Sequence, residues 1–173
     1  MEEEEDAVDR LLTDWFRRIR ESQLNHYASA GYFSRMHVIL GVPTFALGAA
    51  VGTAVFVSIG NNPTGEYKVT VGLVSMLASV LAALHTFLGY SGRAEKHRLT
   101  ASNYAAVRRD LELLKSFPPD NIDEIHQALL PIKQSMDHLA ESSPSIPGWL
   151  FKINTRAMKK RNHHRIFNLR KKD

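Results

Sequence analysis

Charged residues are absent from two long stretches in the middle of the chain. Residues 36–65 contain no Asp, Glu, Lys or Arg, and neither do residues 69–92. An α-helix rises about 1.5 Å per residue, so each stretch is long enough to cross a hydrocarbon core of about 30 Å. Residues 60–65 are rich in Gly and Asn and include a Pro, a composition that ends helices and favours a turn. The pattern predicts a transmembrane helical hairpin over residues 36–92.

The two predicted spans cover about residues 36–59 and 69–90. In lipid every backbone amide must be hydrogen-bonded within its own segment, and a helix meets this requirement. The alternative is a hairpin buried inside a soluble protein. A chain of 173 residues is too short to surround two such helices, so the membrane interpretation is favoured.

Basic residues close to the spans predict the orientation of the hairpin. Lys68, beside Glu66, is the basic residue of the short connection. The others lie before the first span and after the second, at Arg17, Arg18, Arg20, Arg35, Arg93, Lys96 and Arg98. Because basic flanks stay on the cytoplasmic side, we expect a multi-pass protein of the cell inner membrane with both termini in the cytoplasm.

Amphipathic helices are predicted on both sides of the hairpin. Residues 1–35 form an N-terminal cytosolic helix, which either lies on the membrane surface or packs on the other cytosolic helices. Residues 93–155 form a cytosolic helical region, in which Pro118-Pro119 separates two helices and Asp120 or Asn121 caps the second. Apolar residues repeat there at spacings of three and four, at Tyr104, Val107, Leu111 and Leu114 and then at Ile122, Ile125, Leu129, Ile132, Met136 and Leu139. The predicted fold is an all-α membrane protein with an N-terminal helix, a two-helix transmembrane hairpin and a cytosolic helical pair.

One face of the second span is small and weakly polar. Ser75, Ser79, Ala83 and Thr86 share this face, whereas the opposite face is rich in Leu. Small hydroxylated side chains suit the wall of a narrow water-filled path, so these four are candidate pore-lining residues. Close helix packing also selects small residues and is the alternative. His85 stands beside this face, either as a titrating pore residue or as a neutral histidine hydrogen-bonded within the bundle.

A GxxxG motif marks the first span. It consists of Gly48 and Gly52, and Thr44 extends it backwards. Small residues at this spacing let helix backbones approach closely in lipid. We therefore expect these three residues at a helix–helix contact, without a prediction of which helix is the neighbour.

The C-terminal tail, residues 156–173, is strongly basic. It could bind anionic lipid, bind nucleic acid through phosphates, or be a solvated and disordered end. Its position just under the membrane favours lipid, so nucleic acid is not an expected partner. The candidate lipid or anion contacts are Arg156, Lys159, Lys160, Arg161 and Arg165.

The sequence carries no recognisable catalytic signature. It has no Cys, which excludes disulfides and thiolate zinc sites. Gly60 and Gly65 have the spacing of a phosphate-binding loop, but Glu66 and Tyr67 stand where Lys and Ser or Thr would be needed. No catalytic residues, metal or cofactor are therefore expected, and an enzyme is not the favoured class. The acidic residues 2–6 argue against a signal peptide.

Several short segments together resemble a known family. They are Trp15-Phe16-Arg17-Arg18-Ile19-Arg20, Gln23, His26-Tyr27, Tyr32, Arg35-Met36-His37, Leu40-Gly41-Val42-Pro43, Val51-Gly52-Thr53-Ala54-Val55-Phe56, Tyr104 and Ser142-Ser143-Pro144-Ser145-Ile146-Pro147. With the two spans, these segments are similar to the SLATT family, the two-transmembrane effector domain associated with SMODS nucleotidyltransferases and SLOG proteins. The resemblance covers nearly all of residues 8–155 and leaves the basic tail outside. It implies a membrane effector of a prokaryotic conflict system, triggered by a nucleotide signal that a partner makes or senses.

Two functions follow from these expectations. The first is a homo-oligomeric pore or ion channel that damages or depolarises the host membrane in an anti-phage conflict system. One hairpin cannot enclose water, so this function requires several copies in contact with membrane lipids, together with a possible cytosolic nucleotide-signalling partner. The second is a non-conducting membrane anchor that recruits a cytosolic partner through its C-terminal helices.

Overall fold

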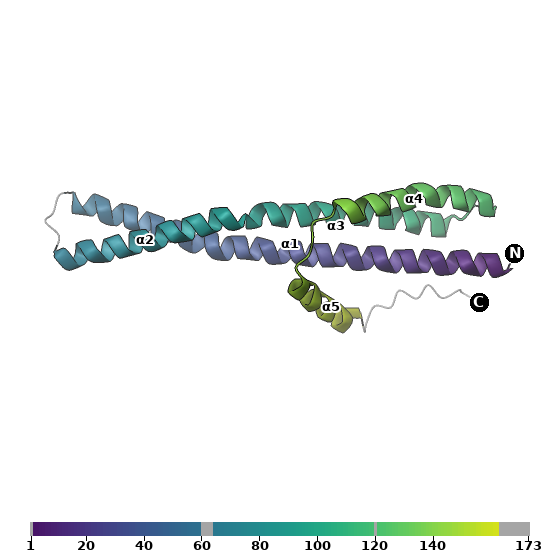
Figure 1. Cartoon of the computed structure of the whole chain (residues 1–173), viewed down its shortest axis with the longest axis horizontal. Coiled ribbons are helices and arrows are strands. Elements are labelled where there is room, and N and C mark those ends of the chain that lie inside the picture. Colours follow the sequence, from purple (N-terminus) through teal and green to yellow (C-terminus); the bar gives the residue numbers. More distant parts are fainter. Residues whose placement is uncertain (1, 60–63, 120, 163–173) are drawn as a thin grey trace. The chain divides into compact units, whose positions relative to one another are not determined.

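A computed structural model describes residues 2–59, 64–119 and 121–162 of the chain (Figure 1). These residues are almost entirely α-helical and contain no strand. The helices are α1 (Glu2–Ser58), α2 (Gly65–Leu88), α3 (Tyr90–Ser116), α4 (Ile122–Ser142) and α5 (Gly148–Asn162). The predicted all-α fold is therefore confirmed.

The N-terminal helix and the first span are one uninterrupted helix, α1. The sequence predicted an N-terminal helix over residues 1–35 and a separate span beginning at 36, because the side chains change from polar to apolar there. A change from polar to apolar side chains does not interrupt backbone hydrogen bonding, so the helix continues. Pro43 lies inside α1, and next to it the Thr44 hydroxyl donates to the Leu40 carbonyl at 2.7 Å.

The second span and the following helix are separated at Gly89. This residue ends α2 in the left-handed conformation, with φ 54° and ψ 36°, where glycine is favoured because it has no Cβ. Its carbonyl accepts a hydrogen bond from Arg93 N at 3.2 Å in the first turn of α3. Gly92 also follows the second predicted span, but it lies inside α3 and does not interrupt the helix.

Residues 1–30 and 95–173 form one compact unit, called unit 1 here, as far as they are described. Its core contains the buried residues Ile19, Tyr104, Val107, Leu111, Leu129, Ile132 and Leu139. Leu12, Trp15, Phe16, Leu114, Ile125 and Met136 pack around them. The seams predicted for the second and third amphipathic helices are thus confirmed as core, except that Ile122, the first residue of α4, is 38% exposed. The N-terminal helix takes the packing alternative, because Ile19 is 1% exposed within this core.

The turn between α3 and α4 has the predicted capping. Asn121 precedes α4, and its side-chain oxygen accepts a hydrogen bond from Asp123 N at 3.2 Å. Asp123 and Glu124 then place negative charge in the first turn, where the helix dipole favours it. Asp120, the other predicted cap, lies outside the described residues.

Residues 31–94 form the other compact unit, unit 2, which contains the hairpin. Its two helical segments meet along a half-buried seam. Phe33 stacks on Tyr90 with ring centroids 6.0 Å apart, and the Tyr67 hydroxyl donates to the Ala54 carbonyl at 3.2 Å. These contacts join the start of one segment to the end of the other, as expected for an antiparallel hairpin.

Candidate functional site

The surface of unit 2 exposes many large apolar side chains. Two helices of the described chain are long and apolar enough to cross a membrane, and no part of their 18-residue apolar windows is buried. Large side chains such as Phe45 (80% exposed) and Phe87 (85% exposed) lie on this surface. A core helix of a soluble protein would bury these side chains, so the exposure supports the membrane interpretation.

The weakly polar face of α2 also lies mostly on the outside of unit 2. Ser79, Ala83 and Thr86 are exposed, while Ser75 is half-buried. The hydroxyl of Ser75 donates to the Val71 carbonyl at 2.7 Å, and that of Ser79 donates to the Ser75 carbonyl at 2.9 Å. Unit 2 therefore presents small side chains on one part of its surface and large apolar ones on another.

The glycines of the first span face open space within the described chain. A Cβ added at Gly48 or at Gly52 would meet no heavy atom within 4 Å. Thr44 is half-buried in the seam of the hairpin. The described part of the hairpin does not supply the neighbour expected for the two glycines.

The structure places His85 between the two helical segments of unit 2. Its ring lies 4.7 Å from the ring of His37, centroid to centroid, with 36° between the planes. Its Nδ1 is buried and has no hydrogen-bond partner among the described residues. A Cβ at Gly41 would come within 3.0 Å of His85 Cε1, so this glycine makes room for the ring. His85 thus belongs to the seam, while Ser79 and Ala83 are outside it.

A buried polar cluster in unit 1 was not anticipated from the sequence. His26 and His97 are 5% and 3% exposed, and their Nδ1 atoms lie 2.9 Å apart. Burial, and then the charge of His97, lowers the pKa of His26 from 6.5 to about 4. Burial also lowers the pKa of His97. Both rings are therefore neutral at pH 7, with one nitrogen donating to the other.

An aromatic side chain packs against this histidine pair. The ring of Tyr104 stacks on His26 with centroids 5.8 Å apart and 18° between the planes. Glu95, two positions before His97 in the sequence, does not belong to this cluster. The structure separates the two, because Glu95 is exposed near Arg98 at 3.5 Å while His97 points inside. Only the spacing of His26 from Ile19, two turns away on the same face, could have signalled that His26 is buried.

The helix α5 is attached to α1 by another buried side chain. Asn154 is 6% exposed, and its Nδ2 donates to the Asn25 carbonyl and to Ser29 Oγ, both at 3.3 Å. Leu150, one turn earlier, is 2% exposed. The basic tail was predicted to begin at residue 156, whereas α5 continues to Asn162 and packs on α1.

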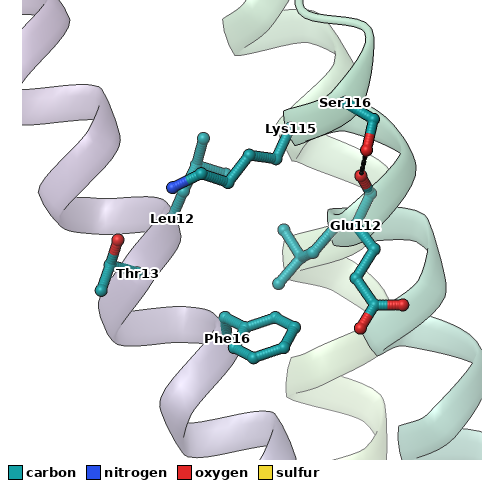
Figure 2. A pocket seen from close by; sticks show the side chains of 7 residues that line it. Leu12, Thr13, Phe16, Glu112, Lys115 and Ser116 are labelled. Carbon is teal, nitrogen blue, oxygen red and sulfur yellow. Dashed lines mark hydrogen bonds between the residues drawn. The ribbon is translucent and has the colours of Figure 1, made fainter. Parts of the chain in front are cut away.

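Unit 1 also has shallow apolar grooves near the first turns of α1. One of about 390 Å³ is lined by Leu12, Phe16 and Leu111, with Lys115 at its edge. Figure 2 shows Phe16 and Lys115 approaching from different helices, and the Ser116 hydroxyl bonded to the Glu112 carbonyl at 2.7 Å. Lys115 Nζ lies 2.8 Å from Asp9 Oδ1. Because the Lys115 ammonium is paired with Asp9, it is not available to bind an anion in this groove.

Little of the predicted basic tail falls within the described side chains. Arg156 is exposed on α5. Lys159, Lys160 and Arg161 belong to the helix by their backbone, but their side chains lie outside the described part of the structure. Arg165 lies outside the described residues altogether.

Among the described residues, no group of three or more His, Cys, Asp or Glu side chains is arranged to hold a metal ion. Comparison of the chain with protein-family models, with curated proteins and with solved structures finds no match.

Proposed function

We propose that this chain is a membrane effector whose hairpin assembles into a homo-oligomeric pore or ion channel. The observation that supports the proposal most is the two-sided exterior of unit 2. Phe87 and other large apolar side chains suit lipid, whereas Ser79, Ala83 and Thr86 form an exposed surface of small residues. A helix that contacted only lipid would not need this second surface.

Oligomerisation is a physical requirement of the proposed pore. Two helices cannot enclose a water path by themselves, and the rings of His37 and His85 lie 4.7 Å apart in the seam between them. Several copies arranged around an axis would enclose a path lined by the surface that contains Ser79. The open space beside Gly48 and Gly52 is available for the neighbouring copy.

The proposed setting is the cell inner membrane, with both termini in the cytoplasm and unit 1 on the cytoplasmic side. The distribution of basic residues around the spans supports this orientation. The resemblance to the SLATT family supports a role in a nucleotide-signalled, anti-phage conflict system. The chain would then respond to a cytosolic partner that makes or senses the nucleotide.

Charge substitution at Ser79 tests the proposal. In a pore wall, Ser79→Glu and Ser79→Lys should both assemble and should shift the cation–anion preference in opposite directions. In a dry packed interface, either charge would cost several kcal/mol, so the protein would fail to assemble. The measurement is the reversal potential across planar bilayers or liposomes under a salt gradient. Ser79→Ala is the uncharged control, which should assemble and conduct with a selectivity between those of the two charged variants.

A second candidate function is a non-conducting anchor that recruits a cytosolic partner. The observation that favours it is a groove of about 560 Å³ between α3 and α4 of unit 1, lined in part by Leu113, Phe117 and Pro131. Leu113 and Phe117 are 63% and 75% exposed, and large apolar side chains exposed together in one groove favour contact with another protein. Release of small ions from liposomes distinguishes the two functions, because an anchor releases none.

A further inference from the structure

The helix α5 has an inner face that is held in place by α1. Leu150 and Asn154 are buried, and the Asn154 side chain is bonded to α1 at Asn25 and Ser29. These bonds fix the rotation of α5 about its own axis. The residues on the opposite side are consequently presented outward in a defined arrangement.

The outer face of α5 combines large apolar and basic side chains. Trp149 and Ile153 are 50% and 54% exposed, and Lys152 and Arg156 are exposed beside them. Spacings of three and four place these residues on one side of a helix, named the outer stripe here. All charged residues in the sequence of α5 are basic, at Lys152, Arg156, Lys159, Lys160 and Arg161.

We propose that the outer stripe of α5 binds the anionic headgroup layer of the membrane that holds the hairpin. An indole suits the boundary between headgroups and acyl chains, because it has an apolar body and one polar N–H. Lys and Arg extend their charged ends toward phosphates while their stems remain against apolar surface. The inference rests on the proposed membrane insertion of unit 2.

Charge favours an anionic lipid surface over a second copy of α5 as the occupant of the outer stripe. A second copy of α5 would bring Lys152 and Arg156 against the same basic residues, and like charges at close range are unfavourable. An anionic lipid surface offers the complementary charge together with an apolar layer for Trp149 and Ile153. The point at which α5 is attached to α1 is also close in sequence to the first span. Asn25 and Ser29 closely precede the charge-free stretch that begins at Met36.

The chain has two tryptophans, which makes a direct test possible. In Trp15→Phe, Trp149 is the single reporter, and in Trp149→Phe the reporter is Trp15, which packs on the core of unit 1. Phe87→Trp, in a chain in which Trp15 and Trp149 are both replaced by Phe, is the reporter for the hairpin. Each full chain is reconstituted into phosphatidylcholine–phosphatidylglycerol vesicles with plain or brominated acyl chains, because bromine quenches indole only on contact.

We expect brominated lipid to lower the emission of Trp149 about twofold, as for an interfacial helix, and to leave Trp15 unchanged. Quenching of Phe87→Trp without quenching of Trp149 would overturn the inference and leave the proposed membrane function intact. Absence of quenching at Phe87→Trp would overturn both. Protection of Trp149 from acrylamide without quenching by bromolipid would identify a protein occupant and would also overturn the inference.

Two further variants address charge and folding. Lys152→Glu combined with Arg156→Glu should abolish the excess quenching of Trp149 in phosphatidylglycerol vesicles over pure phosphatidylcholine, and unchanged quenching would contradict a role for charge. Because Trp15→Phe alters a residue packed on the core, a spin label at Ile153→Cys in the otherwise unaltered chain repeats the test. Its collisions with oxygen should exceed those of a label at Lys133→Cys, an exposed site on α4. Equal oxygen accessibility at the two labels would reject contact with lipid.

Discussion

The Nδ1 atoms of His26 and His97 lie 2.9 Å apart in the interior of unit 1, although 71 positions separate the two residues in the sequence. The contact joins α1 to α3. At this distance one nitrogen must donate and the other must accept. Two protonated rings would instead direct two N–H groups and two positive charges at each other, without water to solvate them.

Acidification should therefore destabilise unit 1. Burial and the neighbouring His97 lower the pKa of His26 from 6.5 to about 4 in the folded chain. Between these values the unfolded chain binds a proton that the folded chain does not, so the free energy of unfolding falls as the pH falls. His26 accounts for about 3 kcal/mol over this window, and its contribution is constant above about pH 6.5, where both states are neutral.

Denaturant unfolding of the detergent-solubilised chain between pH 4.5 and 7.5 measures this effect, with Trp15 as the reporter in Trp149→Phe. His26→Gln combined with His97→Gln should have a shallower pH dependence. His126→Gln is the control, because His126 is exposed on α4 and its loss should leave the slope unchanged. An equally steep slope in the double variant would assign the pH dependence to other groups.

A methyl group at Gly41 should destabilise the hairpin. The added Cβ would lie 3.0 Å from His85 Cε1, so the imidazole would have to move away from its place beside His37. Gly31→Ala is the matched control, since it lies in the same helix and its Cβ would meet nothing within 4 Å. Both substitutions gain helix propensity, so their difference isolates the steric effect, which we expect to cost about 1 kcal/mol or more. Unfolding in mixed detergent measures it, and equal stabilities would mean that the seam adapts freely.

Single cysteines should report the orientation, since the chain has no native cysteine. Thr64→Cys, at the start of α2, should react with an impermeant thiol reagent added to intact spheroplasts. Ser145→Cys, exposed between α4 and α5, should react only after the membrane is opened. The reverse labelling pattern would place unit 1 on the outer side and would remove the proposed cytoplasmic partner.

A bulky residue at Gly52 should disturb assembly without unfolding the hairpin. The site faces open space within the described chain, so Gly52→Leu meets no steric obstacle inside one subunit. If another copy packs there, the larger side chain forces the two backbones apart. Crosslinking in vesicles should then show smaller assemblies, whereas Val55→Leu, at an exposed apolar position, should not. An unchanged distribution for Gly52→Leu would assign the glycines to a lipid-facing surface.

Local patterns were enough to predict the two spans and the helices whose seams form the core of unit 1, but not α5. Leu129, Ile132 and Leu139 are buried as their spacing predicts, because one face of a helix is set by residues three and four apart. The pairing of His26 with His97 was not predictable in this way. A histidine on an otherwise polar segment looks solvated until the helix that packs on it is known, and that helix is distant in sequence.

The boundaries between elements were less predictable than the elements. Gly89 and Gly92 both could have ended α2, and the periodicity on either side does not distinguish them. The choice depends on which glycine adopts the left-handed conformation once α3 has packed, a tertiary effect. The small residues of α2 lie mostly on the surface of unit 2, but a list of small residues does not reveal whether their neighbour is water, lipid or another helix.

The hydroxyl hydrogens of Ser75 and Ser79 are already committed to backbone carbonyls one turn earlier. A serine hydroxyl has one hydrogen and two lone pairs, so what each presents beyond its own helix is electron density alone. A water-filled path along Ser79 would accordingly be lined by acceptors and poor in donors. Such a wall coordinates Na⁺ or K⁺ and offers chloride nothing to bind, so the unmodified chain should show a reversal potential displaced toward that of the cation.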